Sequence, residues 1–218
     1  IAVPTPRDFD SRCDLSAVKN ALFRIDMSLS KIIVIKSTIP PGTTEYFQFI
    51  FPKWKMLFNP EFLTEKQAWE DFTRPDRQIV GMAKNTAAHR KAAQRVMKLL
   101  PNAPYKAITT STEAEMIKIF ANAFLATKVV FANMVYDVCR QTGSDYEQVK
   151  QGMGHDPRIT TSMMTVLMDG FRGYSGKCFP KDVGAIIRFG QLGKHRLPLL
   201  EVADAINWKL LPKRQRRR

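Results

Sequence analysis

One of the three cysteines, Cys178, lies in the stretch GYSGKCFPKD, whose glycines and charges are typical of a loop. Nearby cations favour a reactive thiolate, and Lys177 or Lys181 could supply one. The two glycines would let the backbone approach a ligand closely. Asp182 could begin the following helix as a cap or orient a water molecule. The stretch therefore predicts a nucleophilic cysteine, with a free surface thiol as the alternative.

Two carboxylates could supply acid–base chemistry. The stretch NPEFLTEK places Glu61 and Glu65 four residues apart, so both would share one helix face if the chain becomes helical at Glu61. Two close carboxylates can hold different protonation states, which suits proton transfer. The alternative is that both acids only complement the positive end of a helix.

Three further polar residues, Glu115, Lys118 and Asn122, fall on one stripe of a predicted helix that is otherwise apolar. Polar groups in apolar surroundings are costly unless they are paired or used. The alternative is a half-exposed helix with ordinary polar positions. Ser37 and Thr38 follow a predicted strand, at the edge where open α/β sheets bind ligands, although a hydroxyl that satisfies a turn would look the same.

The elements that would position these residues alternate between strands and helices in the first half of the chain. Strands are expected at 1–4, 31–38, 55–60, 77–83 and 105–110, and helices at 14–29, 43–51, 65–72 and 86–100. Strands alternating with helices predict an α/β domain over residues 1–110 with a doubly wound, parallel, Rossmann-like sheet. No G-x-G-x-x-G occurs, so the sheet is expected to lack its first β-α-β unit.

The second half, residues 111–218, is predicted to be all-helical. Thr112 and Glu115 have the spacing of a capping box, and a long helix without Gly or Pro runs from there to about Arg140. Further helices are expected within 143–154, at 160–168, at 182–191 and after Pro198.

Composition limits the partners. The net charge is +14, and six cationic side chains fall within the last ten residues. A basic tail can bind nucleic acid, but no aromatic and basic residues interleave, so nucleic acid is not expected as a main partner. A basic body also suits a small dianionic ligand such as a nucleotide sugar.

The cysteines are odd in number and far apart, which favours a reducing compartment, the cytoplasm, over a disulfide framework. No run of about 18 apolar residues is found, so no membrane span is expected. The scattered histidines and the lack of a Cys-x-x-Cys pair predict no metal site.

Six stretches in this order resemble the UDP-glucose/GDP-mannose dehydrogenase family over nearly the whole chain: VPTP, KSTIPPGTT, NPEFLTE, EAEMIKIFANAFLATKVVFAN, GHDPRI and GYSGKCFPKDV. The UDP-glucose 6-dehydrogenase branch is the most similar. This family oxidises the C6 alcohol of a nucleotide sugar to a carboxylate with two NAD⁺. The resemblance implies NAD as cofactor, a UDP-sugar as substrate, and a homodimer formed through the long helix.

The resemblance also implies roles for individual residues. Cys178 would attack the C6 aldehyde to form a thiohemiacetal, which a second oxidation converts to a thioester. Five side chains would assist it: the oxyanion partners Lys118 and Asn122, the hydrolytic base Glu61, and the water-positioning Asp182 and Thr38. Substrate contacts would come from Phe62, Leu63, Glu65, Tyr174, Ser175, Gly176 and Arg158, the last reaching the site of a neighbouring subunit. Cofactor contacts would come from Val3, Pro4, Thr5, Thr38, Glu65 and Lys181.

The chain also departs from the family pattern. The family loop usually reads Gly-Tyr-Gly-Gly-Ser-Cys, whereas Ser175 and Lys177 stand here for a glycine and the serine. The side chain of Ser175 would narrow the loop that is expected to contact the sugar, and the charge of Lys177 would change the electrostatic field at the Cys178 thiol. Lys66 also replaces a usual glycine. Because the opening β-α-β unit and the C-terminal domain are not found, we interpret the chain as a central portion, with a non-catalytic dimerisation or regulatory module as the alternative.

Overall fold

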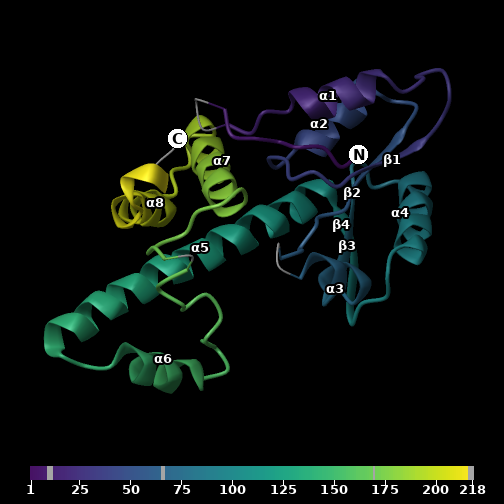
Figure 1. Cartoon of the computed structure of the whole chain (residues 1–218). Helices are drawn as coiled ribbons and strands as arrows, with labels where there is room; N and C mark the ends of the chain where they lie inside the picture. Colours follow the sequence, from purple (N-terminus) through teal and green to yellow (C-terminus); the bar gives the residue numbers. More distant parts are fainter. Residues whose placement is uncertain (9–11, 65–66, 169, 216–218) are drawn as a thin grey trace. The chain divides into compact units, whose positions relative to one another are not determined.

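The structure is a computed structural model that describes residues 1–8, 12–64, 67–168 and 170–215 (Figure 1). The chain divides into two compact units, and the division falls inside the long helix. The first unit contains Ile1–Asp8 and Cys13–Phe120, and the second is formed mainly by Ala121–Arg218. Each unit is described separately below.

The first unit is built on a four-stranded sheet in the order β1-β2-β3-β4 (Figure 1). The strands are β1 (Ile32–Ile35), β2 (Lys55–Phe58), β3 (Arg77–Met82) and β4 (Tyr105–Thr110), and the helices are α1 (Ser16–Phe23), α2 (Thr43–Ile50), α3 (Ala68–Thr73) and α4 (Ala87–Leu99). The predicted α/β class with a Rossmann-like sheet is confirmed. One pair differs from the expected parallel arrangement, because β2 and β3 are antiparallel. Antiparallel neighbours need no crossover, and the connection between these two carries the six-residue α3.

Both faces of the sheet are covered, as expected for a doubly wound domain. Met56 and Phe58 pack with residues of α1 and α2, whereas Leu57 between them packs with Ala92 and Ala93 of α4. This alternation follows from the two-residue period of a strand.

Two predictions near the start of the chain, the strand at 1–4 and the full length of the helix at 14–29, are wrong. Residues 1–4 do not form the predicted strand, because the side chain of Ser37 takes up both backbone groups of Val3: the Ser37 hydroxyl accepts from the Val3 N–H and donates to its carbonyl oxygen, each at 2.8 Å. Helix α1 ends at Phe23 rather than residue 29. Beyond it, the Asp26 carboxylate accepts from the N–H and hydroxyl of Ser28 in a local turn that competes with the helix.

The long helix α5 spans Ser111–Thr142, as predicted, but its capping box involves other residues. Thr110 and Glu113 bond reciprocally: the Thr110 N–H donates to the Glu113 carboxylate at 2.8 Å, and the Glu113 N–H donates to the Thr110 hydroxyl at 3.2 Å. The predicted pairing of Thr112 with Glu115 is therefore wrong.

By length and composition alone, α5 could cross a membrane: an 18-residue window has a mean hydropathy of 1.4, and 39% of it is buried. The sequence expectation missed this window because it looked for an unbroken apolar run. A core helix of a globular domain has the same composition, and the buried side chain of Glu115 bonds to the backbone of α2 within the first unit.

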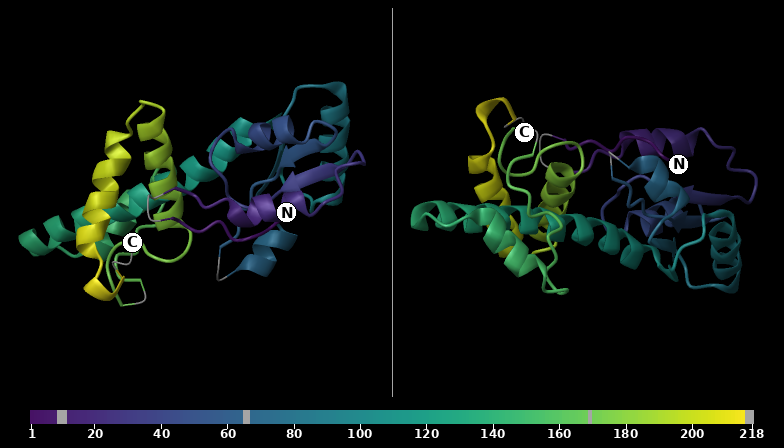
Figure 2. Two further views of the ribbon diagram at one scale, coloured as in Figure 1. Left: turned by 90° about the horizontal axis from the view of Figure 1, so that it is seen from above. Right: turned by 60° about the horizontal axis from the view of Figure 1, so that its bottom comes forward.

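The second unit is helical. Its elements are the rest of α5, α6 (Tyr146–Gly154), α7 (Phe179–Leu192), α8 (Pro198–Leu210) and a 3₁₀ turn (Lys213–Gln215). Helices α7 and α8 lie side by side, joined by residues 193–197 (Figure 2). The predicted helix at 160–168 is wrong, because Thr160 and Met163 have positive φ angles of 56° and 62°, which a right-handed helix does not allow. Helix α7 begins three residues before the predicted Asp182, with Pro180 in its first turn.

Candidate active site

The exposed thiol of Cys178 lies at the amino end of α7, in the second unit. Cys178 occupies the N-cap position, and its carbonyl oxygen accepts the first helical bond, from the Asp182 N–H at 2.9 Å. The positive end of a helix stabilises negative charge close to it. The sulfur is thus both accessible and placed where an anionic centre is favoured.

Next to this thiol in sequence, the buried carboxylate of Asp182 is held by two partners. The Asn122 amide nitrogen donates to one oxygen at 2.5 Å, and the Lys181 ammonium lies 2.6 Å from the other. Only 1% of Asp182 is exposed. The structure therefore brings together Asn122, Lys181 and Asp182, three residues that sequence reasoning placed in the site, although Asp182 does not act as the predicted helix cap.

The glycine-containing loop before Cys178 is anchored by a residue that sequence reasoning missed. Asn207 of α8 accepts from the Tyr174 N–H at 2.7 Å and donates to the Tyr174 carbonyl at 3.0 Å. The Tyr174 hydroxyl also donates to Asp204 at 3.1 Å. A buried amide on an otherwise apolar helix face is the sequence signal that could have revealed Asn207. Tyr174 itself is buried, while Ser175 is half-buried and Gly176 is exposed.

Gly173 and Gly176 both have φ of +84°, a conformation that side chains disfavour. At Gly173 a Cβ atom would lie 2.5 Å from the Asn207 side-chain oxygen, whereas at Gly176 it would meet open space. The first glycine is therefore fixed by packing, and the second leaves room beside the thiol loop.

Arg158 stands on the surface of the second unit, with 87% of its side chain exposed. Its guanidinium bonds to Asp156, which holds the pKa of that carboxyl below its usual value. Nothing in this placement engages the thiol loop, and the predicted contact of Arg158 with a neighbouring subunit stays a prediction.

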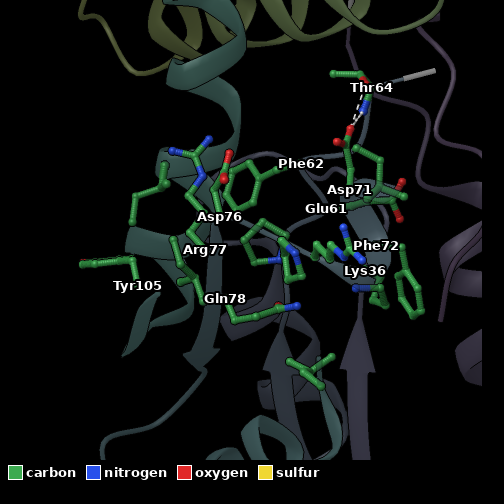
Figure 3. Close-up of a pocket in the computed structure, with 17 residues that line it drawn as sticks. Lys36, Glu61, Phe62, Thr64, Asp71, Phe72, Asp76, Arg77, Gln78 and Tyr105 are labelled. Carbon is green, nitrogen blue, oxygen red and sulfur yellow. Dashed lines mark hydrogen bonds between the residues drawn. The ribbon is translucent and has the colours of Figure 1, made fainter. Parts of the chain in front are cut away.

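In the first unit, a pocket of about 750 Å³ lies at the end of the sheet where β1 and β2 finish and β3 begins (Figure 3). Its lining includes Lys36, Glu61, Phe62, Leu63, Asp71 and Arg77. Three predicted site residues, Glu61, Phe62 and Leu63, thus share one cavity. Burial lowers the pKa of Lys36, and the negative charge of Glu61 opposes this shift.

The ring of Phe62 contacts two cations. The Arg77 guanidinium lies 3.8 Å from the ring centroid, and the Lys118 ammonium lies 5.6 Å from it. Such contacts stabilise cations over an aromatic face. Lys118 is 9% exposed, so the predicted oxyanion partner is a buried ammonium group beside a predicted substrate residue.

The predicted helical face of Glu61 and Glu65 does not form at Glu61, because residues 59–64 are not helical. The Asp71 carboxylate instead accepts from the N–H and hydroxyl of Thr64, both at 2.7 Å, which ties this segment to α3 (Figure 3). Glu65 lies outside the described residues.

Sequence reasoning also missed two residues that support the pocket. The Lys36 ammonium donates to the Asn59 side-chain oxygen at 2.5 Å, and the Asn59 amide donates to the Ile79 carbonyl at 2.8 Å. Asn59 is fully buried and links the residue that follows β1 to the backbone of β3. Its place directly after a strand, before Pro60, was the available signal.

The predicted cofactor residues at the start of the chain lie beside the end of β1. The Thr5 hydroxyl donates to the Thr38 carbonyl at 2.8 Å, and Val3 bonds to Ser37. Val3 and Thr38 are half-buried and Pro4 is exposed, whereas Thr5 is buried. Accessible residues therefore gather at a strand's carboxyl end, where doubly wound sheets bind nucleotides. Among the described residues, no three His, Cys, Asp or Glu side chains gather as metal ligands.

Comparisons with known proteins find similar proteins over nearly the whole chain. Residues 1–100 match the NAD binding domain of the UDP-glucose/GDP-mannose dehydrogenase family, and residues 112–209 match its central domain. The chain is 38% identical over 219 residues to a UDP-glucose 6-dehydrogenase of Pseudomonas aeruginosa, covering 95% of this chain and 47% of that protein. It is 36% identical over 217 residues to one of Rhizobium meliloti, covering 95% and 49%.

Among solved structures, a UDP-glucose dehydrogenase from Pyrobaculum islandicum is similar with a TM-score of 0.83 and 33% identity, over 95% of this chain and 49% of that one. A UDP-D-ManNAc dehydrogenase from Pyrococcus horikoshii has a TM-score of 0.81 at 22% identity, over 96% and 50%, which shows the shared fold. The chain thus spans about half the length of these relatives.

Proposed function

The chain belongs to the UDP-glucose/GDP-mannose dehydrogenase family, and from this premise we propose that it carries the catalytic residues of a UDP-sugar 6-dehydrogenase. One C6 alcohol, two NAD⁺ and one water would give one carboxylate, two NADH and three protons. The observation that carries the proposal is the accessible Cys178 thiol at the start of α7, four residues before the buried Asp182 that Asn122 and Lys181 hold.

NAD is the cofactor of the domain that residues 1–100 match. The accessible Val3, Pro4 and Thr38 at the end of β1 fit this role, and so does the Lys181 ammonium, which can face phosphate charge. Thr5 supports the site through Thr38. When bound, NAD⁺ accepts one hydride from C6 in each oxidation.

The covalent step uses Cys178. After the first oxidation has produced the C6 aldehyde, the thiolate sulfur bonds to C6 and the carbonyl electron pair moves onto oxygen, which gives a thiohemiacetal. The buried ammonium of Lys118 and the Asn122 amide would stabilise this oxyanion. Loss of the second hydride from C6 restores the carbonyl and leaves a thioester.

Hydrolysis completes the reaction. Glu61 takes a proton from a water molecule, the water oxygen bonds to C6, and the C–S bond breaks to return the thiolate and release the carboxylate. Asp182 and Thr38 would hold this water. Because Asn122 and Lys181 bond to Asp182, its carboxylate has a fixed orientation, which favours such positioning.

In the first unit, substrate contacts are proposed for the pocket residues Phe62 and Leu63. In the second unit they are proposed, from the family resemblance, for the loop residues Tyr174, Ser175 and Gly176. Glu65 is proposed beside the nicotinamide and the substrate from the family resemblance alone. A UDP-sugar is doubly anionic, which suits a chain of net charge +14. A reducing, cytoplasmic setting is proposed from the odd number and wide spacing of the cysteines.

We also propose a homodimer formed through α5. Within the second unit this helix exposes an apolar row, which consists of Phe124, Phe131, Met134 and Val138, each at least half exposed. Exposed apolar rows of this kind mark protein interfaces. From the family resemblance, we propose that the exposed Arg158 contacts the substrate of the neighbouring subunit in this dimer.

The test is to mix the purified chain with UDP-glucose and NAD⁺ and to follow NADH absorbance. Two NADH per UDP-glucose are expected, and Cys178→Ala should abolish this stoichiometry, whereas Cys139→Ala, which changes a cysteine of the helical core, should retain it. Absence of NADH together with absence of NAD⁺ binding by calorimetry would overturn the proposal and favour the non-catalytic module.

A further inference from the structure

The carboxylate of Glu115 is fully buried in the first unit and has no assigned role in the chemistry above. It accepts three hydrogen bonds from one turn: from the Gly42 N–H at 2.6 Å, from the Thr44 N–H at 2.9 Å and from the Thr44 hydroxyl at 2.5 Å. A side chain of α5 therefore caps the amino end of α2, more than 70 positions earlier in the sequence.

This arrangement is costly, which argues for a specific purpose. Burial raises the pKa of Glu115 to about 7, and the nearby charge of Glu45 acts in the same direction, while the bonds from Thr44 and Gly42 oppose it. A buried carboxyl group is retained where its hydrogen bonds define one geometry. Here that geometry belongs to the turn that begins α2, where Gly42 has a φ of +85°.

The turn leads directly back to Thr38. The Thr43 N–H and hydroxyl bond to the Pro40 carbonyl, at 3.2 and 2.6 Å, and Ile39 is fully buried. Thr38 itself is held on its other side by the hydroxyl of Thr5. Between Thr38 and α2 the backbone is thus anchored at short intervals, and Glu115 supplies the anchor at the far end.

Glu115 also precedes Lys118 by three positions, so both side chains point to the same side of α5. We infer that Glu115 is a positioning residue, which fixes the turn after Thr38 against the helix that carries Lys118. This inference rests on the proposed function, which gives Thr38 and Lys118 their roles, and Glu115 itself is not assigned a contact with substrate or cofactor.

A first experiment needs no activity. Glu115→Gln keeps the size of the side chain but presents an amide donor to the Gly42 N–H, so amide hydrogen exchange at Gly42 should become about tenfold faster, as expected for a lost charged hydrogen bond. The NMR signal of the Thr38 methyl group should shift. The exposed Glu113→Gln on the same helix is the matched control and should change neither.

A second pair of variants guards against misfolding of Glu115→Gln. Thr44→Val removes the hydroxyl that bonds to Glu115, and Thr44→Ser retains it. The methyl signal of Thr38 should shift in the first variant and stay in place in the second. Unchanged Gly42 exchange and Thr38 signals in both Glu115→Gln and Thr44→Val would overturn the inference.

Kinetics then separate this inference from the proposed function. In the NADH assay, Glu115→Gln should lower kcat by about tenfold with little change in KM, as expected for a small misplacement of a reacting group. In a Thr38→Val background the same substitution should have much less effect, because it acts through Thr38. If Glu115→Gln lowered kcat equally in both backgrounds, Glu115 would not act through Thr38. If the unaltered chain produced no NADH, only the proposed function would be refuted.

Discussion

The Asn122 amide on α5 and the Asp182 carboxylate on α7 share a hydrogen bond of 2.5 Å, although 60 positions separate them in sequence. The bond ties the start of α7, which presents Cys178, to the long helix within the second unit. Lys181 completes the arrangement by neutralising the buried carboxylate. The position of the thiol therefore depends on a small polar network that is sensitive to single substitutions.

Asp182→Asn should weaken both folding and turnover. The substitution keeps the shape of the side chain but removes the charge that balances Lys181, so we expect a loss of about 3 kcal/mol in the free energy of unfolding. Urea unfolding measures this loss, and kcat in the NADH assay should fall with it. Glu201→Gln, which breaks the more exposed ion pair with Arg196, should change stability little. Equal effects of the two variants would contradict a structural role of the network.

The two glycines of the thiol loop provide a matched pair. Both have φ of +84°, so the backbone strain caused by an alanine is the same at each position, about 1 kcal/mol or more. At Gly173 the new Cβ would also collide with Asn207, whereas at Gly176 it would meet open space. Gly173→Ala should therefore lower the melting temperature clearly more than Gly176→Ala. Equal melting temperatures would show that the Asn207 contact does not constrain the loop.

Much of the fold could be predicted from local patterns. The β-branched run that gives β1, the Pro-Gly turn before α2 and the uninterrupted apolar spacing of α5 all formed as expected, because local preference and burial agree there. The failures have a different cause. The helix expected at 160–168 is interrupted by the positive φ angles of Thr160 and Met163, which their residue types do not indicate.

The candidate site could also be predicted only in part, because some of its residues lie in recognisable local motifs and others do not. Residues in recognisable motifs, such as Asn122 and Asp182, could be named, and the structure brings these two into contact. The supporting residues Asn207, Asn59 and Lys36 were not named, because the weak local signals at Asn207 and Asn59 do not identify their partners, which lie in distant segments. Such partners depend on the topology of the fold, because they are distant in the sequence, and local residue spacing does not predict which distant segments come into contact.

The raised pKa of Glu115 predicts a distinct pH dependence of stability. The native carboxyl group titrates at about 7, whereas its ordinary value is 4.5, so between these values the native state binds more protons than the unfolded state. The contribution of this group is therefore fully present below about pH 4.5 and is lost as the pH rises through 7, by up to about 3 kcal/mol. Urea unfolding from pH 4 to 8 should show this decline in the unaltered chain and a smaller one in Glu115→Gln. If the free energy of unfolding changed with pH equally in both proteins, Glu115 would not be the group responsible.

The apolar row on α5 predicts that association depends on its aromatic side chains. Phe124 is 66% exposed and Phe131 is 53% exposed, and they are seven positions apart on one side of the helix. Replacing both by Asp would place two charges in the proposed interface, so the dissociation constant of the dimer should rise at least about 100-fold. Sedimentation equilibrium over a range of concentrations measures it.

Trp69→Asp is the matched control for this prediction, because Trp69 is an equally prominent aromatic residue, 79% exposed, on α3 of the first unit. If general loss of apolar surface governed association, Trp69→Asp would weaken it as much as the double substitution on α5. If α5 forms the interface, the control should associate like the unaltered chain, and Arg158→Ala should then lower turnover without changing the dissociation constant. A monomeric unaltered chain at every concentration would exclude the dimer and with it the role proposed for Arg158.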